Sequence, residues 1–124
     1  GAISISSDKI SLLATIVEGL SANSDKATLT ITSNDYSGNV SLSSSGGCPG
    51  SATFSVSSVS SVSIDSVLID RGESKYIDFR VKNIPGNTSA QQCAITVTAS
   101  AASDGSSSSI TLKIETITSG WEEF

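Results

Sequence analysis

Apolar and hydroxyl-bearing residues alternate one by one over long parts of this chain. In segments 27–32 (ATLTIT) and 94–99 (AITVTA) an apolar residue occupies every second position. Successive side chains of a β-strand point to opposite faces, so this period predicts strands with one face toward a core and the other toward water. No segment carries the apolar stripe of a helix, and the pattern therefore predicts an all-β protein.

The same alternation, interrupted by turn residues, predicts nine strands, with the fifth and sixth also open to interpretation as one bent element. They are 2–6, 12–17, 26–33, 38–43, 52–57, 62–69, 74–82, 93–101 and 109–117. Turns 34–38, 70–74 and 104–105 are predicted as hairpin connections, because Asn, Asp and Gly tolerate positive φ. Short strands at this spacing are typical of a sandwich or barrel. We predict a β-sandwich of about seven to nine antiparallel strands in two sheets, as one domain over residues 1–124.

The apolar side of each strand predicts the core. Its members are Leu29, Ile31, Val40, Leu42, Phe54, Ile77, Phe79, Val81, Ile95, Val97, Leu112 and Ile114. On segment 74–82 the complementary face, with Tyr76, Asp78, Arg80 and Lys82, is expected to point to solvent.

Segment 54–69 breaks the period of two. Val56, Val59 and Val62 recur every third residue, which a flat strand cannot bury on one face. Two explanations stay open: a bulge or crossover re-aims the chain, or some of these valines remain exposed as a partner surface on a sheet edge. We predict an interface for a partner or a second copy at Val56, Val59, Val62 and Val67.

Cys48 and Cys93 are the two cysteines of the chain, 45 positions apart. Neither belongs to a CxxC pair, so zinc or a redox-active dithiol is poorly supported. We predict a disulfide between them, with two separate buried thiols as the alternative. Cys48 lies in the turn-rich segment 46–50, where a free thiol is hard to bury, and this favours the disulfide and an oxidising compartment.

Composition argues against several function classes. Twelve acidic and seven basic residues give a net charge of −5, which disfavours nucleic acid and an anionic membrane surface as partners. Histidine is absent, and none of the 29 serines lies in a GxSxG segment. A Ser-Lys dyad remains an open alternative as a catalytic pair. Glu73 and Asp78 are the nearest pair of carboxylates of interest, and a solvated turn and an exposed strand face account for them. We predict no enzyme, no cofactor and no metal site.

Two further features concern the surface. A carbohydrate-binding surface needs exposed aromatic side chains that stack on sugars. The candidates are Tyr36, Tyr76 and Trp121, which lie on different elements. Asn39 and Asn87 each begin an N-x-S/T segment, the acceptor pattern for N-glycosylation, and Asn87 is the better candidate because it lies in a loop.

Neither a signal-peptide pattern nor a run of about 18 apolar residues occurs among the residues of this sequence. Because its first predicted strand starts at the second residue, we expect a membrane segment upstream in the full-length protein. The module would then be extracellular or in the cell envelope, on the pseudoperiplasmic side, and membrane-anchored through that segment.

Five segments resemble those of a known group of domains. Segments 37–43, 52–55, 71–74, 93–99 and 109–115 are similar to strands and turns of extracellular immunoglobulin-like domains of archaea and bacteria, over about residues 26–117. The resemblance implies an immunoglobulin-like Greek-key topology. In its length and its pattern of residues the chain also resembles the soluble domains of the F family of archaellum accessory proteins, which anchor the archaeal motility filament.

The resemblance implies a non-enzymatic function in protein–protein attachment. The expected partner is an envelope or surface-layer protein, or a second copy in a homodimer, and the narrower expectation is a link between an archaellum and the surface layer. The alternative is a carbohydrate-binding or spacer module of a larger surface protein or enzyme.

Overall fold

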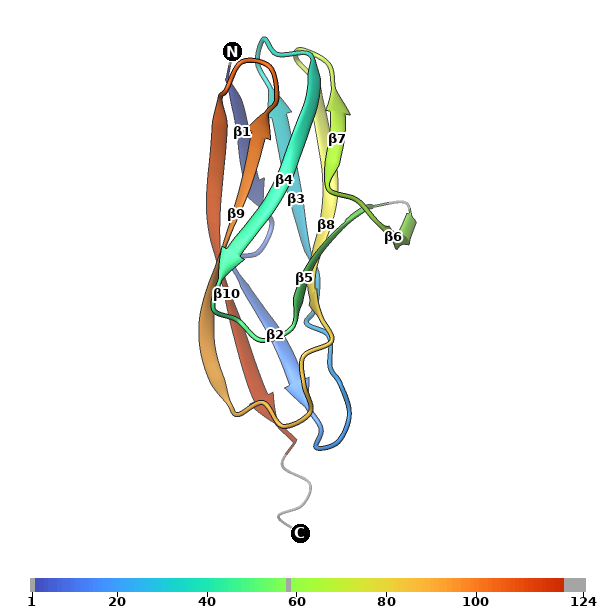
Figure 1. Cartoon of the computed structure of the whole chain (residues 1–124), viewed down its shortest axis with the longest axis vertical. Coiled ribbons are helices and arrows are strands. Elements are labelled where there is room, and N and C mark those ends of the chain that lie inside the picture. The colour runs from blue at the N-terminus through green and yellow to red at the C-terminus, as the bar shows by residue number, and fades with distance from the viewer. Residues whose placement is uncertain (1, 58, 120–124) are drawn as a thin grey trace.

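A computed structural model describes residues 2–57 and 59–119, and within them the chain forms ten strands and no helix (Figure 1). The strands are β1 (Ile3–Ser7), β2 (Ser11–Ile16), β3 (Ala27–Ser33), β4 (Gly38–Gly46), β5 (Ser51–Val56), β6 (Val59–Ser63), β7 (Ser66–Ile69), β8 (Ser74–Lys82), β9 (Gln91–Ala101) and β10 (Ser107–Thr118). Sheet A has the order β1-β3-β8-β5-β6, and sheet B the order β2-β10-β9-β4-β7. The prediction of an all-β, two-sheet sandwich is confirmed.

The core lies between the two sheets and follows the period of two. All twelve residues predicted for it are buried, so this prediction is also confirmed. In β3, the buried residues Ala27, Leu29, Ile31 and Ser33 alternate with half-buried threonines. Phe79 is fully buried and its ring lies 5.4 Å from the ring of Phe54 on the neighbouring strand. Burying each such side chain is worth about 1.5–3 kcal/mol.

The chain first runs along sheet A and then changes to sheet B within a few residues. β1 pairs antiparallel with β3, whereas β2 pairs with β10 in parallel. Asp8, between β1 and β2, fixes the departure from sheet A, because its carboxylate accepts the Thr28 N–H at 2.8 Å and its own N–H donates to the Thr28 carbonyl.

Segment 62–69, predicted as one strand, is divided between the sheets, and this part of the prediction is wrong. β6 ends sheet A and β7 ends sheet B. The division lies between Ile64, whose N–H donates to Phe54 of sheet A, and Asp65, whose carbonyl accepts from Leu42 of sheet B. The β5–β6 pairing also has a register shift between Ser55 and Val56. A bulge and a crossover therefore both interrupt the period of two.

Two of the three predicted hairpin turns are crossovers between sheets. Segment 34–38 leads from β3 in sheet A to β4 in sheet B, and segment 70–74 leads from β7 back to β8. Asp104 and Gly105 do lie between the antiparallel neighbours β9 and β10. Turn residues indicate where a chain reverses its direction, but they do not indicate which strands pair afterwards.

Buried Tyr36 shapes the first crossover. Its N–H donates to the Ser33 hydroxyl at 3.0 Å, and its own hydroxyl donates to the Asn39 carbonyl at 2.7 Å. Gly38 adopts a φ of 144°, and a Cβ at this position would lie 2.7 Å from the Tyr36 hydroxyl oxygen. Glycine is needed here because of that close approach.

Candidate interaction surface

Each sheet has two end strands, and on one side of the sandwich both of them are covered. The N–H of Ile5 in β1 donates to the Ser108 hydroxyl of β10 at 3.2 Å, so β10 lies over the β1 edge. At the β2 edge, the Leu13 N–H donates to the Asp25 carboxylate at 2.8 Å, and the Leu13 carbonyl accepts from the Asp25 N–H at 2.9 Å. Covered edges of this kind prevent unwanted strand pairing.

The opposite side is formed by the other two end strands, β6 and β7 (Figure 1), which no residue covers in this way within the part of the chain that the structure describes. β7 pairs with β4 through Val40–Val67, and the Leu42 N–H donates to the Asp65 carbonyl in the same register. Because hydrogen-bonding positions alternate along an antiparallel strand, Val67 and Ile69 bond to β4. The backbone N–H and C=O groups of Ser66 and Leu68 therefore point away from the sheet, where no described residue bonds to them.

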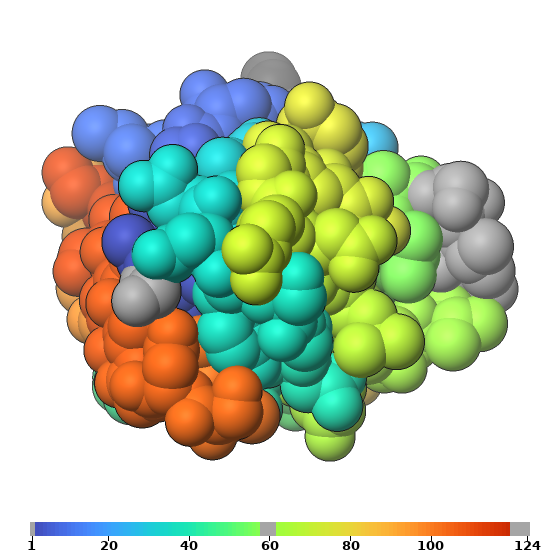
Figure 2. Space-filling view, turned by 90° about the horizontal axis from the view of Figure 1, so that it is seen from above, coloured from blue at the N-terminus to red at the C-terminus, as the bar shows by residue number. Residues whose placement is uncertain are grey.

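Exposed apolar side chains accompany these open edges. Val56 is 40 % exposed, Val62 is 53 % exposed and Leu68 is 67 % exposed. Figure 2 shows the light-green part of the chain, around β6, protruding from the side of the molecule. We call the surface formed by β6, β7 and these three side chains the open edge.

The open edge differs from the predicted interface at Val67. This side chain is half-buried and packs against the core, because alternate residues of β7 point inward together with Ile69. Leu68, which the sequence reasoning missed, is the exposed residue of β7. In the apolar run Val67-Leu68-Ile69 the sequence pattern does not reveal which side chain points outward. Val56 and Val62 are exposed as predicted, and the side chain of Val59 lies outside what the structure describes.

Acidic residues flank β7. Asp65 and Asp70 lie at its two ends and are exposed. Farther along, the Glu73 carboxylate accepts the Asp70 N–H at 2.9 Å and lies 3.3 Å from the Lys75 ammonium. The Asp70 hydrogen bond, followed by the contact with Lys75, holds the pKa of Glu73 below its ordinary value. The carboxylate therefore stays ionised at neutral pH and stabilises the turn before β8.

Asp78 was expected on a solvent-facing strand surface, and this expectation is wrong. The residue points to the outer face of sheet A, yet it is only 4 % exposed. Its carboxylate accepts a hydrogen bond from the Ser57 hydroxyl at 3.1 Å and lies 3.6 Å from the Lys26 ammonium. Ser57, just after β5, and Lys26, just before β3, come from both neighbouring strands. Asp78 and Glu73 thus have separate cationic partners, and these contacts bring no pair of carboxylates together.

The two cysteines form the expected disulfide. It joins Cys48, in the turn between β4 and β5, to Cys93 in β9, with a Cα–Cα distance of 5.5 Å. Both side chains are half-buried against the core. A disulfide is compatible with an extracellular location.

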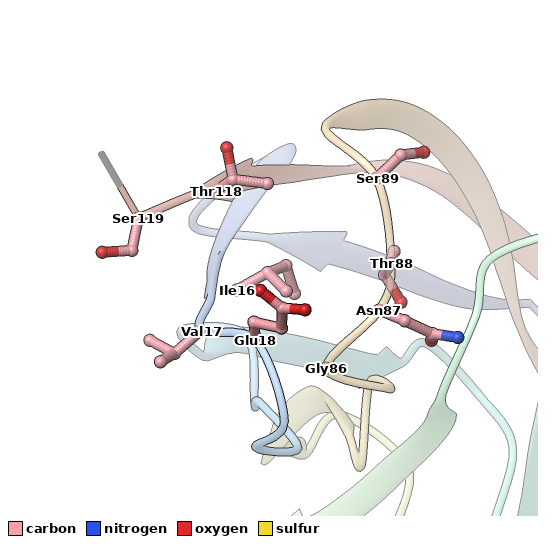
Figure 3. A pocket seen from close by; sticks show the side chains of 9 residues that line it. All are labelled: Ile16, Val17, Glu18, Gly86, Asn87, Thr88, Ser89, Thr118 and Ser119. Atoms are coloured by element: carbon pink, nitrogen blue, oxygen red, sulfur yellow. The ribbon is translucent and has the colours of Figure 1, made fainter. Parts of the chain in front are cut away.

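A cleft of about 460 Å³ lies at the end of the sandwich where β2 and β10 finish (Figure 3). It is bounded by Ile16, Val17, Glu18, Gly86, Asn87, Thr88, Ser89, Thr118 and Ser119. In Figure 3 the side chain of Glu18 lies at the centre of the cleft, and the amide of Asn87 points away from it. Six of these nine residues carry a side-chain oxygen, and none of the nine is aromatic.

The other candidate residues do not assemble into a site. Tyr36 is buried, while Tyr76 is 57 % exposed on β8 and Trp121 lies outside the described residues. Within residues 2–57 and 59–119, no three His, Cys, Asp or Glu side chains come close enough together to hold a metal ion. The same part of the chain contains no helix that could span a membrane.

Comparison with known proteins gives structural neighbours only. No protein-family model and no curated protein sequence matches the chain. A family 123 glycoside hydrolase from Clostridium perfringens matches 95 % of this chain with a TM-score of 0.62 and 15 % identity, but the match covers only 27 % of the hydrolase.

Two smaller proteins match over most of their own length. The FixG-related protein from Vibrio parahaemolyticus has a TM-score of 0.56 and 11 % identity, with 94 % of both chains covered. The seventh PapD-like domain of human CEP192 has a TM-score of 0.51 and 11 % identity, with 93 % of this chain and 84 % of that chain covered. At these identities the likeness concerns the fold alone, and that fold is an immunoglobulin-like β-sandwich.

Proposed function

We propose that this chain is a non-enzymatic attachment module of the cell envelope or cell exterior, which binds a protein partner through the open edge. The observation that carries the proposal is the contrast between the two sides of the sandwich. On one side the end strands are covered by Ser108 and Asp25, whereas on the other side β7 leaves the backbone groups of Ser66 and Leu68 without a partner among the described residues.

Strand addition is the binding mode that such an edge supports. A partner segment in extended conformation pairs with the N–H and C=O groups of Ser66 and Leu68, and its side chains contact Leu68. Val62 and Val56 extend the apolar contact along β6 and β5. The absence of histidine from the sequence and the disulfide support a binding role outside the cytoplasm.

The test compares three lysine variants. Val62→Lys and Leu68→Lys each place a charge in the proposed contact, whereas Leu20→Lys changes a side chain of similar exposure, 62 %, in the turn after β2. Binding of the purified chain to cell envelopes from the producing cells is measured by co-sedimentation, and self-association by sedimentation equilibrium. We expect at least tenfold weaker binding for the two edge variants, since an unpaired charge in an apolar contact costs roughly 2 kcal/mol or more. Equal binding of all three variants would show that the interface lies elsewhere.

We also propose a more specific partner. The resemblance to archaeal envelope domains suggests a surface-layer protein as the partner and anchoring of a motility filament as the purpose. Purified surface-layer protein in place of whole envelopes tests this proposal, which fails if the chain binds envelopes but not that protein.

A spacer is the second candidate. It is favoured by the match to a domain-sized part, 27 %, of a much longer glycoside hydrolase. A spacer needs no ligand of its own, so the wild-type chain would then bind neither envelopes nor a second copy in the same assay.

A further inference from the structure

Two segments of the chain have the N-x-S/T pattern, and their structural surroundings differ. The first is Asn39-Val40-Ser41 in β4, and the second is Asn87-Thr88-Ser89 in the loop between β8 and β9. Oligosaccharyltransferases bind such a segment in their own active-site cleft, with the asparagine amide at the sugar donor and the hydroxyl two residues later held by the enzyme. An acceptor must therefore protrude from the folded protein or leave its fold.

The Asn39 segment cannot protrude without disruption of sheet B. β4 lies between β9 and β7, and Val40 in the middle of the segment is fully buried. The Asn39 carbonyl accepts hydrogen bonds from the Tyr36 hydroxyl at 2.7 Å and from the Ala102 N–H at 3.2 Å. Presentation of Asn39 to an enzyme would break these bonds and expose a core side chain.

The Asn87 segment protrudes already. Asn87 is the third residue of a turn closed by a hydrogen bond from the Thr88 N–H to the Pro85 carbonyl, at 3.0 Å. Both Asn87 and Ser89 are exposed. Figure 3 shows the Asn87 amide directed away from Glu18 and from the centre of the cleft. No described residue forms a hydrogen bond with the side chain of Asn87 or with the hydroxyl of Ser89.

The loop that carries Asn87 is attached to the sandwich at both ends. Ile84 is fully buried, and it forms a two-way backbone bridge with Ala22. On the other side the Thr116 hydroxyl donates to the Ser89 carbonyl at 2.7 Å. These contacts involve neither the Asn87 amide nor the Ser89 hydroxyl, so a glycan can be added without a change in the fold.

We propose that Asn87 is an N-glycosylation site and that Asn39 is not. The sugar donor is a lipid-linked oligosaccharide. The Asn87 side-chain nitrogen forms a bond to the first carbon of the oligosaccharide, the bond from that carbon to the carrier phosphate breaks, and the amide nitrogen gives one proton to a base of the oligosaccharyltransferase. The phosphorylated lipid carrier leaves with the electron pair of the broken bond.

A glycan on Asn87 would leave the open edge free to bind a partner, because the two lie at different places on the sandwich. In Figure 1 the loop between β8 and β9 lies at the end of the sandwich where β10 finishes, and β7 lies toward the other end. A glycan on Asn87 would be attached beside the cleft formed with Glu18, Thr118 and Ser119. Glycosylation and binding through β7 are thus separate properties, and failure of one does not imply failure of the other.

Mass spectrometry of tryptic peptides tests the proposal, with protein purified from the cells that produce it naturally. Cleavage after Lys26, Arg71, Lys82 and Lys113 places Asn39 in peptide 27–71 and Asn87 in peptide 83–113. The Cys48–Cys93 disulfide joins these two peptides, so reduction and alkylation come first. We expect peptide 83–113 to carry the mass of a glycan and peptide 27–71 to be unmodified.

Four variants expressed in the same cells separate the acceptor from its surroundings. Asn87→Gln and Ser89→Ala are expected to remove the added mass completely, whereas Ser89→Thr and Asn39→Gln are expected to retain it. The proposal is overturned if peptide 83–113 of the natural protein is fully unmodified, if the glycan is found on peptide 27–71, or if Ser89→Ala keeps it. Far-UV circular dichroism verifies that all four variants fold.

Discussion

Asp25 pairs with Leu13 through both its side chain and its backbone. The carboxylate accepts the Leu13 N–H at 2.8 Å, and the Asp25 N–H donates to the Leu13 carbonyl at 2.9 Å. The backbone N–H and C=O groups of Leu13 point away from β10, and both therefore have a hydrogen-bond partner in Asp25. A single residue between β2 and β3 therefore closes the outer edge of sheet B at its centre.

Replacement of Asp25 tests this closure. We expect Asp25→Ala to lower the free energy of unfolding by about 1–2 kcal/mol, because the hydrogen bond between Leu13 and a charged acceptor is lost. Urea unfolding at neutral pH measures the change. Asp25→Asn is the matched control, since its side-chain oxygen still accepts from Leu13, and we expect less than half of the loss. Equal losses in the two variants would mean that the charge near Lys9, not the closed edge, is responsible.

The sequence pattern predicts the core correctly because burial itself demands the period of two. Every residue in the predicted core list is buried, from Leu29 in β3 to Ile114 in β10. The pattern does not predict which sheet a strand joins, because both sheets bury the same kind of face. For this reason segment 62–69 looked continuous, although its two halves bond to Phe54 and Leu42 in different sheets.

The candidate site was predicted only in part for a related reason. Exposure of Leu68 and burial of Asp78 depend on what lies beside the strand, not on the order of residues within it. Leu68 is exposed because β7 ends its sheet. Asp78 is buried because Ser57 and Lys26 reach over it from the two neighbouring strands. A local sequence window contains neither of these relationships.

The disulfide is expected to contribute strongly to stability. Its loop spans 45 residues, and in the chain-entropy model a loop of this size is worth roughly 4 kcal/mol. We expect Cys48→Ala, Cys93→Ala and the double variant to lose about the same free energy of unfolding, because each removes the same cross-link. Thiol titration of the denatured, unreduced wild-type chain should detect no free thiol. Detection of two thiols per chain would contradict the cross-link itself.

The turn before β8 is expected to make stability depend on pH. The folded-state pKa of Glu73 lies below the ordinary value of 4.5, owing first to the Asp70 N–H and then to Lys75. A carboxylate with a lowered pKa stabilises the fold above its unfolded-state pKa, and this contribution disappears as the pH falls through the folded-state pKa. Glu73→Gln should therefore be less stable than the wild type at pH 7, and the difference should vanish in acid.

Chemical unfolding at neutral pH and at about pH 2 measures this difference, with Glu18→Gln as the control. The Glu18 carboxylate has no hydrogen bond or ion pair with another described residue, so its replacement should leave the stability unchanged at both pH values. A difference between Glu73→Gln and the wild type that persists undiminished in acid would attribute the effect to packing instead of ionisation.

The buried carboxylate of Asp78 gives the last prediction, which compares two lysines in ion pairs of similar length. Lys26 lies 3.6 Å from Asp78, which is 4 % exposed, whereas Lys9 lies 3.7 Å from Asp25, which is 48 % exposed. Removal of Lys26 leaves a buried charge whose remaining side-chain partner among the described residues is the Ser57 hydroxyl, and we expect Lys26→Met to cost about 1–3 kcal/mol. Lys9→Met should cost less than about 1 kcal/mol, because water solvates the exposed Asp25 carboxylate.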